Sequence, residues 1–281
     1  MMRFLLKINK KRILVTGASG FIGGHLVARF KEGHDIVAPN FSELDLTNKN
    51  MAVAYSESLG KIDMVIHLAS RLITTGEADD MSVLYDNIKI AENTALITSR
   101  AECVKFINFS SMAVYPNVSG EFTETSPTGT SGNTECIYGL SKICTENLFD
   151  HFLKEKGVSV IHLRMAQVYG EGIREDRIIP IMMRELKDTN NITVFGDGER
   201  VSNFIHIDEV IEAVEMFVKE DVTGIYNLGD EQLSYFELAE KVIREHGNES
   251  SKIIKKSKGT RAKFILDISK LNKFRSGSMK R

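Results

Sequence analysis

The sequence predicts an α/β protein built on a doubly wound parallel sheet, and three observations support this class. Apolar runs rich in Val, Ile and Leu recur along the chain and are separated by segments with helical periodicity. The runs are continuous rather than alternating, which indicates strands that are covered on both faces. A glycine-rich stretch, "TGASGFIGGHL", follows the first run directly. Strand–helix alternation of this kind implies parallel strands joined by right-handed crossovers.

Five strands are expected in the first part of the chain. They are the apolar stretches at 12–17, 34–39, 61–70, 104–111 and 158–165. The helix after the first strand is expected to begin at Phe21 and to close at Gly33. Two longer helices are predicted at 86–101 and 137–155.

After about residue 170 the elements become shorter and less regular. Helices are predicted in "IIPIMMRELKD", "DEVIEAVEMFVKE" and "SYFELAEKVIREHG", and short strands in "ITVFGDG", "SNFIHI" and "GIYNLG". Asp208 is placed to cap the second of these helices, while Ser234 and Gly247 bound the third. We predict one domain over residues 11–170 and a smaller α/β lobe over 171–281, with an intermittent boundary that lets some elements return to the first domain.

Composition and charge narrow the possible partners. The 281 residues are 42% hydrophobic and 26% charged, with a formal net charge of -2, so no strong attraction to nucleic acid or an anionic membrane is expected. The three cysteines lack metal-ligand spacing and suit a reducing compartment. The apolar run in "MMRFLLKINKKR" is too short for a signal peptide. We expect a cytoplasmic protein with no metal, nucleic-acid or membrane partner.

The glycine-rich stretch predicts a nucleotide site. Gly17, Gly20 and Gly23 have the spacing G-x-x-G-x-x-G between a strand and a helix. Glycines permit a tight turn and a close approach of the backbone to a ligand. Phe21 and Ile22 open the helix, whose free N–H groups and dipole favour a pyrophosphate. The alternative, a structural turn, is less consistent with this strand–turn–helix context.

Residues at the end of the second strand are expected to contact the adenosine part of a dinucleotide. An acidic residue there would suit NAD and an arginine NADP. The sequence has neither: Asn40 and Ser42 suit either cofactor, and the missing carboxylate slightly favours NADP. Asp45 and Leu46 follow and are placed to meet the adenine edge, although Asp45 could equally cap the next helix.

The stretch "IYGLSK" places Tyr138 four residues before Lys142, on one face of a predicted helix. A free tyrosine has a pKa of about 10, too high for an efficient base near neutrality. A lysine ammonium one turn away favours the phenolate. The pair therefore fits proton transfer, although an ordinary amphipathic helix could carry the same two residues. His67, His162 and His206 are expected to be packed histidines rather than catalysts.

Taken in order, these motifs resemble the extended short-chain dehydrogenase/reductases. The likeness is to their NAD(P)-dependent nucleotide-sugar epimerases, dehydratases and reductases, and it implies a Rossmann-type fold and a substrate-binding C-terminal lobe. It is carried by "TGASGFIGGHL", "HLAS", "NFSSMAVYP", "YGLSK", "LRMAQVYGEG" and "GDGERVSNFIHIDEV". These motifs run from Lys11 to about Lys273, nearly the whole chain.

The resemblance implies a role for each matched residue. Tyr138 would be the general acid/base, Lys142 its electrostatic partner and a ribose contact, and Ser111 the group that hydrogen-bonds the reacting sugar oxygen. The residues implied on the cofactor side are Leu68, Ala69, Ser70 and Asn87. The residues implied on the substrate side are Met112, Gln167, Arg200 and Arg261.

The resemblance also limits the reaction. Relatives that perform 4,6-dehydration usually carry Asp-Glu just after the catalytic serine or threonine, where this chain has Met112-Ala113. We therefore expect a 4-epimerase, similar to UDP-glucose 4-epimerase, or a 4-ketoreductase with features of GDP-fucose synthase and the dTDP-4-keto-sugar reductases. The rival hypothesis is a catalytically degenerate dinucleotide-binding protein with a regulatory or scaffold role.

The substrate side departs from the pattern of the relatives. Ser202 stands where many of them have an arginine that meets the substrate diphosphate, and serine cannot replace that charge. Arg200 and Arg261 are the candidates to take its place. The resemblance implies a UDP-, dTDP- or GDP-linked sugar as substrate, a part in polysaccharide precursor synthesis, and a homodimer.

Overall fold

The computed structural model describes residues 10–73, 80–131 and 135–278. The elements of the first part are β1 (Arg12–Thr16), α1 (Phe21–Phe30), β2 (Asp35–Val37), α2 (Lys49–Leu59), β3 (Met64–His67), α3 (Met81–Arg100), β4 (Lys105–Ser111), the 3-10 turn η1 (Met112–Val114), β5 (Gly120–Phe122), α4 (Cys136–Lys154) and β6 (Ser159–Met165). Those that follow are β7 (Gln167–Tyr169), α5 (Ile178–Thr189), β8 (Asn191–Phe195), η2 (Gly196–Gly198), β9 (Val201–His206), α6 (Ile207–Lys219), β10 (Gly224–Leu228), β11 (Glu231–Ser234), α7 (Tyr235–His246), β12 (Lys252–Lys256), β13 (Phe264–Leu266) and α8 (Ser269–Ser278).

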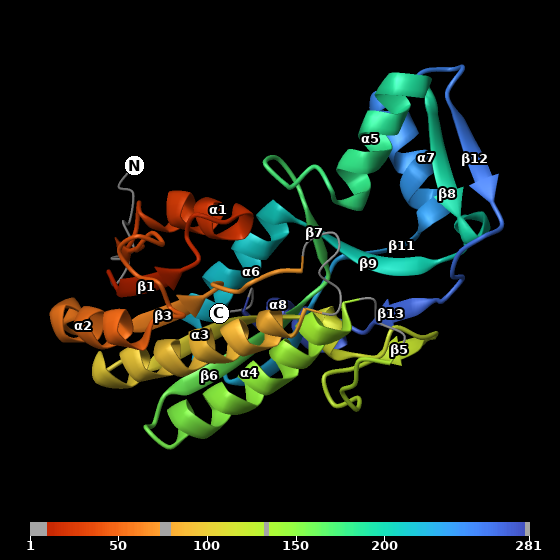
Figure 1. Ribbon diagram of the computed structural model, residues 1–281. Helices are drawn as coiled ribbons and strands as arrows, with labels where there is room; N and C mark the ends of the chain where they lie inside the picture. The colour runs from red at the N-terminus through yellow and green to blue at the C-terminus, as the bar shows by residue number, and fades with distance from the viewer. Residues whose placement is uncertain (1–9, 74–79, 132–134, 279–281) are drawn as a thin grey trace. The chain divides into compact units, whose positions relative to one another are not determined.

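A six-stranded parallel sheet in the order β10-β6-β4-β3-β1-β2 confirms the predicted fold class. From β1 the chain moves outward to β2, then returns across β1 to β3 and continues to β4. Figure 1 shows α1 on one face of these strands and α2 and α3 on the other, which is the arrangement that right-handed crossovers produce when the direction reverses. The switch in direction lies between β1 and β3, which is where open α/β sheets bind ligands beyond the carboxyl ends of their strands.

The chain divides into two compact units. The first comprises Met1–Phe109, Ile143–His162 and Val222–Gly224, and the second Ser110–Lys142, Leu163–Asp221 and Ile225–Arg281. The domain boundary near residue 170 stays a prediction.

In the first unit, apolar side chains of β1, β3, β4, α2, α3 and α4 form a buried core. His67 packs there between Phe106 and Phe149, with ring centroids 5.8 and 5.1 Å away, and its Nδ1 lies 2.7 Å from Thr16 Oγ1. The prediction that His67 is a packed histidine is thus confirmed.

A second buried histidine joins α4 to the sheet. His162, which is 1% exposed, places Nδ1 3.0 Å from Asn108 Nδ2 and Nε2 2.9 Å from an Asp150 carboxylate oxygen. Lys154 Nζ lies 2.7 Å from the other oxygen of Asp150. Burial alone would raise the pKa of Asp150, but the His162 hydrogen bond and the Lys154 ammonium outweigh it and lower the pKa below its ordinary value.

This pairing makes a prediction about acid stability. Because the pKa of Asp150 is lower in the folded protein than in the unfolded chain, its stabilisation is complete above about pH 4 and is lost as pH falls through the folded-state pKa. Urea titrations from pH 3 to 7 should show a shallower decline of the unfolding free energy below about pH 5 for Asp150→Asn than for the wild type. Glu57→Gln, which removes an exposed carboxylate on α2, should keep the wild-type dependence of the unfolding free energy on pH. Equal pH dependence for all three proteins would contradict the lowered pKa of Asp150.

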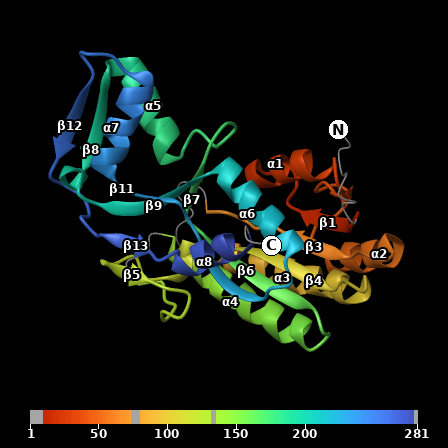
Figure 2. The same ribbon diagram turned by 180° about the vertical axis from the view of Figure 1, so that it is seen from behind.

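The second unit holds three small sheets: β11-β9-β7, β12-β8 and β13-β5. Helices α5 and α7 cover a core of Met182, Leu186, Ile192, Val194, Phe204, Leu238, Ala239 and Val242. Figure 2 shows α8 beside α6, where the rings of Phe274 and Phe217 stack 4.8 Å apart. The short strands β5, β7, β11, β12 and β13 and the helix α8 were not predicted, because each of these strands has five residues or fewer and carries little periodicity of its own.

Three helix boundaries test the predictions about capping. Ser234 caps α7 through a reciprocal bond with Glu237, and Gly247 ends that helix, as predicted. The prediction for Asp208 was wrong: His206 is the N-cap of α6 and Asp208 lies in its first turn. His206 accepts the Asp208 N–H through Nδ1 at 3.3 Å, so its side chain fills the capping role expected of a carboxylate.

Candidate active site

The glycine loop between β1 and α1 folds back on the end of β3. Gly17 has φ +73°, and a Cβ there would lie 2.6 Å from the backbone nitrogen of Ala69. A Cβ on Gly23 would lie 2.2 Å from the Gly17 carbonyl oxygen. Both positions therefore require glycine, one for backbone conformation and close contact, the other for contact alone.

The third glycine leaves the start of α1 open. Gly20 is the N-cap of α1, supplies no side-chain hydrogen bond to the first turn, and is exposed, and no acidic residue stands in that turn. Phe21 and Ile22 follow as the first, half-buried residues of the helix. The turn thus presents backbone N–H groups and the positive end of the helix dipole beside a glycine without a side chain. These features fit the pyrophosphate of a dinucleotide.

The segment after β2 closes on itself. Asn40 Oδ1 accepts hydrogen bonds from Ser42 Oγ at 2.6 Å and Ser42 N at 2.9 Å. Asp45 Oδ1 accepts bonds from Thr47 N and Oγ1, while Asn48 caps α2, so the reading of Asp45 as a helix cap was wrong. Leu46 is buried. Nothing in this geometry supports the lean toward NADP, because Asn40 and Ser42 bond to each other and introduce no cation.

Asn87 on α3 fixes the loop that follows β3. Its Oδ1 accepts the Arg71 N–H at 2.7 Å and the Ser70 hydroxyl at 3.1 Å, and its Nδ2 donates to the Arg71 carbonyl at 3.0 Å. Leu68 and Ala69 lie directly before this clamp, and Ala69 is the residue that Gly17 approaches. Asn87 therefore shapes the loop that lines the glycine turn, and its place on the cofactor side stays a prediction.

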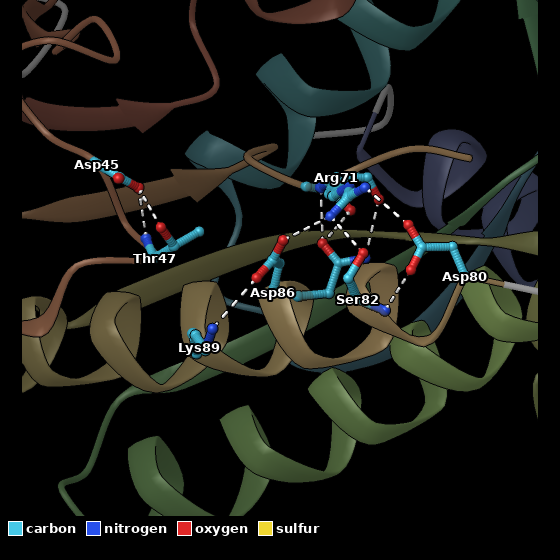
Figure 3. A network of polar contacts seen from close by, with 9 residues as sticks. Asp45, Thr47, Arg71, Asp80, Ser82, Asp86 and Lys89 are labelled. Carbon is cyan, nitrogen blue, oxygen red and sulfur yellow. Dashed lines mark hydrogen bonds and ion pairs between the residues drawn. The ribbon is translucent and has the colours of Figure 1, made fainter. Parts of the chain in front are cut away.

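A cluster around Arg71 was not predicted. Figure 3 shows its guanidinium among Asp80, Ser82 and Asp86, with contacts of 3.1 Å to Asp80 and 2.8 Å to Asp86. Its Nη1 also donates to Ser82 Oγ at 2.7 Å. The cluster joins the loop after β3 to the N-terminal turn of α3. No short stretch of the sequence predicts this cluster, because its members are residue types that are common on protein surfaces. Only the fold brings them together.

Ser111 ends β4 and begins the turn η1. It is half-buried, and its Oγ accepts the Ala113 N–H at 3.1 Å. Met112, the implied substrate contact, is the first residue of the turn and is half-buried as well. The serine hydroxyl keeps its own proton and a second lone pair for other partners.

Tyr138 and Lys142 lie one turn apart on α4, as the spacing predicted. Lys142 is only 5% exposed, and its Nζ lies 5.5 Å from the centroid of the Tyr138 ring. Gly139, next to Tyr138, packs against η1 so closely that a Cβ would lie 2.3 Å from the Ala113 carbonyl oxygen. The structure therefore joins the helix that bears Tyr138 and Lys142 to the turn that bears Ser111.

The remaining predicted substrate residues, Gln167, Arg200 and Arg261, lie in separate surroundings. Gln167 Nε2 donates to Ser202 Oγ at 2.8 Å, and Ser202 is buried. The Arg200 guanidinium stacks 5.1 Å from the Tyr235 ring centroid. Arg261 pairs with Asp197, on the η2 turn, and with Glu199, whose carboxylate is 3.7 Å away. Two carboxylates thus offset the charge of Arg261, which the sequence had offered as a diphosphate contact.

Residues 13–229 match the sequence profile of the NAD dependent epimerase/dehydratase family. The chain belongs to this family. Among its relatives, GDP-mannose 3,5-epimerase 1 of Oryza sativa subsp. indica is 30% identical over 263 residues, covering 83% of this chain and 68% of that protein. GDP-L-fucose synthase of Azorhizobium caulinodans is 27% identical over 255 residues, covering 83% and 81%. Members of this epimerase/dehydratase family are enzymes that act on nucleotide sugars.

Solved structures of the family share the fold. The UDP-N-acetylglucosamine 4-epimerase of Methanobrevibacter ruminantium superposes with a TM-score of 0.80 at 21% identity, covering 94% of this chain and 92% of that one. The UDP-glucose 4-epimerase of Thermotoga maritima gives 0.78 at 22% identity, covering 93% and 91%. At these identities the likeness concerns the fold.

Two further features of this family member can be stated for the part of the chain that the structure describes. No helix there is long and apolar enough to cross a membrane. The same residues contain no group of three or more His, Cys, Asp and Glu side chains arranged to hold a metal ion.

Proposed function

We propose that this protein is an NAD(P)-dependent 4-epimerase or 4-ketoreductase of nucleotide sugars. The proposal rests above all on one observation: a nearly buried lysine stands one helical turn from Tyr138, with its ammonium 5.5 Å from the phenol ring. A cation held in such a place favours the phenolate more than a solvated one would, because the dielectric screening around it is weaker.

In this proposal Tyr138, Lys142 and Ser111 each have a different part in the proton transfer. Tyr138 takes the proton of the sugar hydroxyl as the carbinol C–H bond breaks, and returns it when the carbonyl is reduced. Lys142 stabilises the phenolate that is present before the first step and restored by the second, and Ser111 hydrogen-bonds the sugar oxygen. A bound NAD or NADP would supply the hydride chemistry, which the protein alone cannot do.

The dinucleotide is assigned to the glycine loop. Gly17, Gly20 and Gly23 would lie against its pyrophosphate, and the loop held by Asn87 would lie beside its nicotinamide end. Solved relatives such as a dTDP-glucose 4,6-dehydratase of Bacillus anthracis contain NAD, and this supports NAD as the first cofactor to test. Gln167, Arg200 and Arg261 are the proposed substrate contacts. A homodimer and a cytoplasmic location remain part of the proposal.

Dehydration is a weaker candidate, although relatives include dTDP-D-glucose 4,6-dehydratases. Eliminating water across C5 and C6 needs an acid and a base in addition to Tyr138. At the two positions where such relatives carry carboxylates, this chain has Met112 and Ala113, and neither side chain can transfer a proton.

A substrate panel tests the proposal. UDP-glucose, UDP-N-acetylglucosamine, dTDP-glucose and GDP-mannose would each be incubated with the protein and NAD, with products identified by NMR. A 4-epimer formed without net cofactor consumption indicates the epimerase. For the reductase, the panel is repeated with dTDP-4-keto-6-deoxyglucose and GDP-4-keto-6-deoxymannose plus NADH or NADPH, and loss of 340 nm absorbance is the readout. If calorimetry shows dinucleotide binding while no sugar gives product, the enzyme hypothesis fails and the rival, a non-catalytic dinucleotide-binding protein, is favoured.

A further inference from the structure

The turn η1 is held at both ends by contacts that lie within the second unit. Ser111, its N-cap, carries the proposed substrate contact, and Tyr115, its C-cap, is 1% exposed. Only three residues separate them, and the Tyr115 N–H bonds back to the Met112 carbonyl at 3.1 Å. A displacement at Tyr115 is therefore transmitted along a short, hydrogen-bonded stretch to Ser111.

The Tyr115 hydroxyl has three polar partners from distant parts of the sequence. Arg164 Nη1 on β6 donates to it at 2.8 Å, while the Asn227 Oδ1 on β10 and the Thr123 carbonyl, 2.8 and 2.9 Å away, are the two acceptors for its single proton. The Arg164 guanidinium also lies 4.9 Å from the ring centroid. Burial raises the pKa of Tyr115, so the phenol keeps its proton and remains a donor near neutral pH.

Asn227 is itself fixed, so it forms a rigid anchor. Its Nδ2 donates to the Phe122 carbonyl at 3.0 Å and the Asp267 carbonyl at 2.9 Å, and its backbone N–H donates to a Glu124 carboxylate oxygen at 2.9 Å. With both amide protons on carbonyls, the amide oxygen faces the tyrosine hydroxyl. A buried network of this kind favours one arrangement, because a shift would break hydrogen bonds that water cannot replace.

The opposite side of η1 meets α4. The Ala113 carbonyl lies against Gly139, where no side chain intervenes, and Gly139 is adjacent to Tyr138. The turn is thus confined between the Tyr115 anchor and the helix that carries the proposed acid/base.

We propose that Tyr115 is a positioning residue, whose buried hydroxyl fixes η1 so that Ser111 stands at the correct place relative to Tyr138. The inference rests on the proposed function, since it assigns Tyr115 a part in that reaction through Ser111. Tyr115 does not contact the reacting atoms. Losing its hydroxyl leaves Asn227 and Arg164 each short of a partner and lets the turn move, and a shift of about 1 Å in a catalytic group can lower turnover by about 100-fold.

A double-mutant cycle tests this inference. Turnover would be measured for Tyr115→Phe, Ser111→Ala and the double variant, on the sugar that gives product in the substrate panel. We expect Tyr115→Phe to lower kcat at least about 10-fold, with KM changed less than kcat. In the Ser111→Ala background the same change should have less than about a twofold effect, because the group it positions is gone.

Tyr226→Phe is the matched control, because Tyr226 is a neighbouring buried tyrosine on β10 with 6% exposure. It should keep wild-type kcat, and melting temperatures would be recorded for every variant. An equal loss of kcat from Tyr115→Phe in both backgrounds would overturn the inference, since that result describes a purely structural tyrosine. Unchanged kcat for Tyr115→Phe would overturn it as well.

A second measurement separates failure of this inference from failure of the proposed function. Backbone hydrogen exchange of residues 111–115 would be followed in the wild type and in Tyr115→Phe without any substrate. Faster exchange at the Ala113 N–H, which bonds to Ser111 Oγ, is the expected result. If the wild type turns over no sugar, the proposed function fails; exchange that is unchanged in the variant would overturn the anchoring of η1 by itself.

Discussion

Replacing Tyr138 by phenylalanine is expected to lower turnover of the accepted nucleotide sugar by about 10²–10⁴-fold, the usual range for a positioned acid/base. The ring that lies beside Lys142 remains, and only the group that exchanges the proton is lost. Cofactor affinity should change little, because the glycine loop is untouched. The measurement is kcat at saturating sugar, together with calorimetric titration of NAD and NADP.

Tyr85→Phe provides the control for this experiment. Tyr85 is a helical tyrosine on α3 with 56% exposure, so loss of its hydroxyl should leave kcat unchanged. If Tyr138→Phe retained more than about a tenth of wild-type kcat, Tyr138 would not be the acid/base and the mechanism would need another proton acceptor.

The second large effect is expected at Gly23, where alanine should abolish or greatly weaken dinucleotide binding. A Cβ there would lie 2.2 Å from the Gly17 carbonyl oxygen and 2.8 Å from the Ala18 Cα, both backbone atoms that move only with the loop. Overpacking of this kind costs about 1–3 kcal/mol of stability. We expect at least about a 10-fold loss of NAD affinity, because the displaced loop no longer fits the pyrophosphate.

The next residue supplies a matched control for Gly23. A Cβ on Gly24 would lie 3.8 Å from the nearest neighbour, the Ala18 carbonyl oxygen, which is ordinary contact. Gly24→Ala in the exposed part of α1 should therefore stabilise the protein by about 0.5–1 kcal/mol and keep its NAD affinity. Equal NAD affinity for the Gly23 and Gly24 variants would place the dinucleotide away from this loop.

The parts of the fold that were predicted correctly are those with strong local signals. The central strands β1, β3, β4 and β6 are continuous apolar runs, and α3, α4, α6 and α7 are long enough for their periodicity to be clear. The short strands of the second unit escaped prediction, because a strand such as β7 or β13 gains its order from pairing with a distant strand. The cap of α6 was misassigned because a histidine nitrogen can accept the same hydrogen bond as a carboxylate.

In the candidate site, too, local features could be predicted and long-range contacts could not. The turn formed by Gly17, Gly20 and Gly23 and the one-turn spacing of Tyr138 and Lys142 could be stated from the sequence, because both follow from the geometry of a short, continuous stretch. The surroundings of Arg261 could not, since Asp197 lies 64 residues away, and the Gln167–Ser202 bond joins residues 35 apart.

The sequence by itself determined the class of sheet, the nucleotide-type loop and the chemical pair on α4, because backbone conformation and helical spacing are local properties. Only the tertiary structure decided which contacts hold these residues in place. Lys142 is buried, Gly139 lies against Ala113, and Tyr115 bonds to Asn227, 112 residues further along the chain. These contacts depend on packing and on satisfying buried polar groups, and no single stretch of sequence contains both partners.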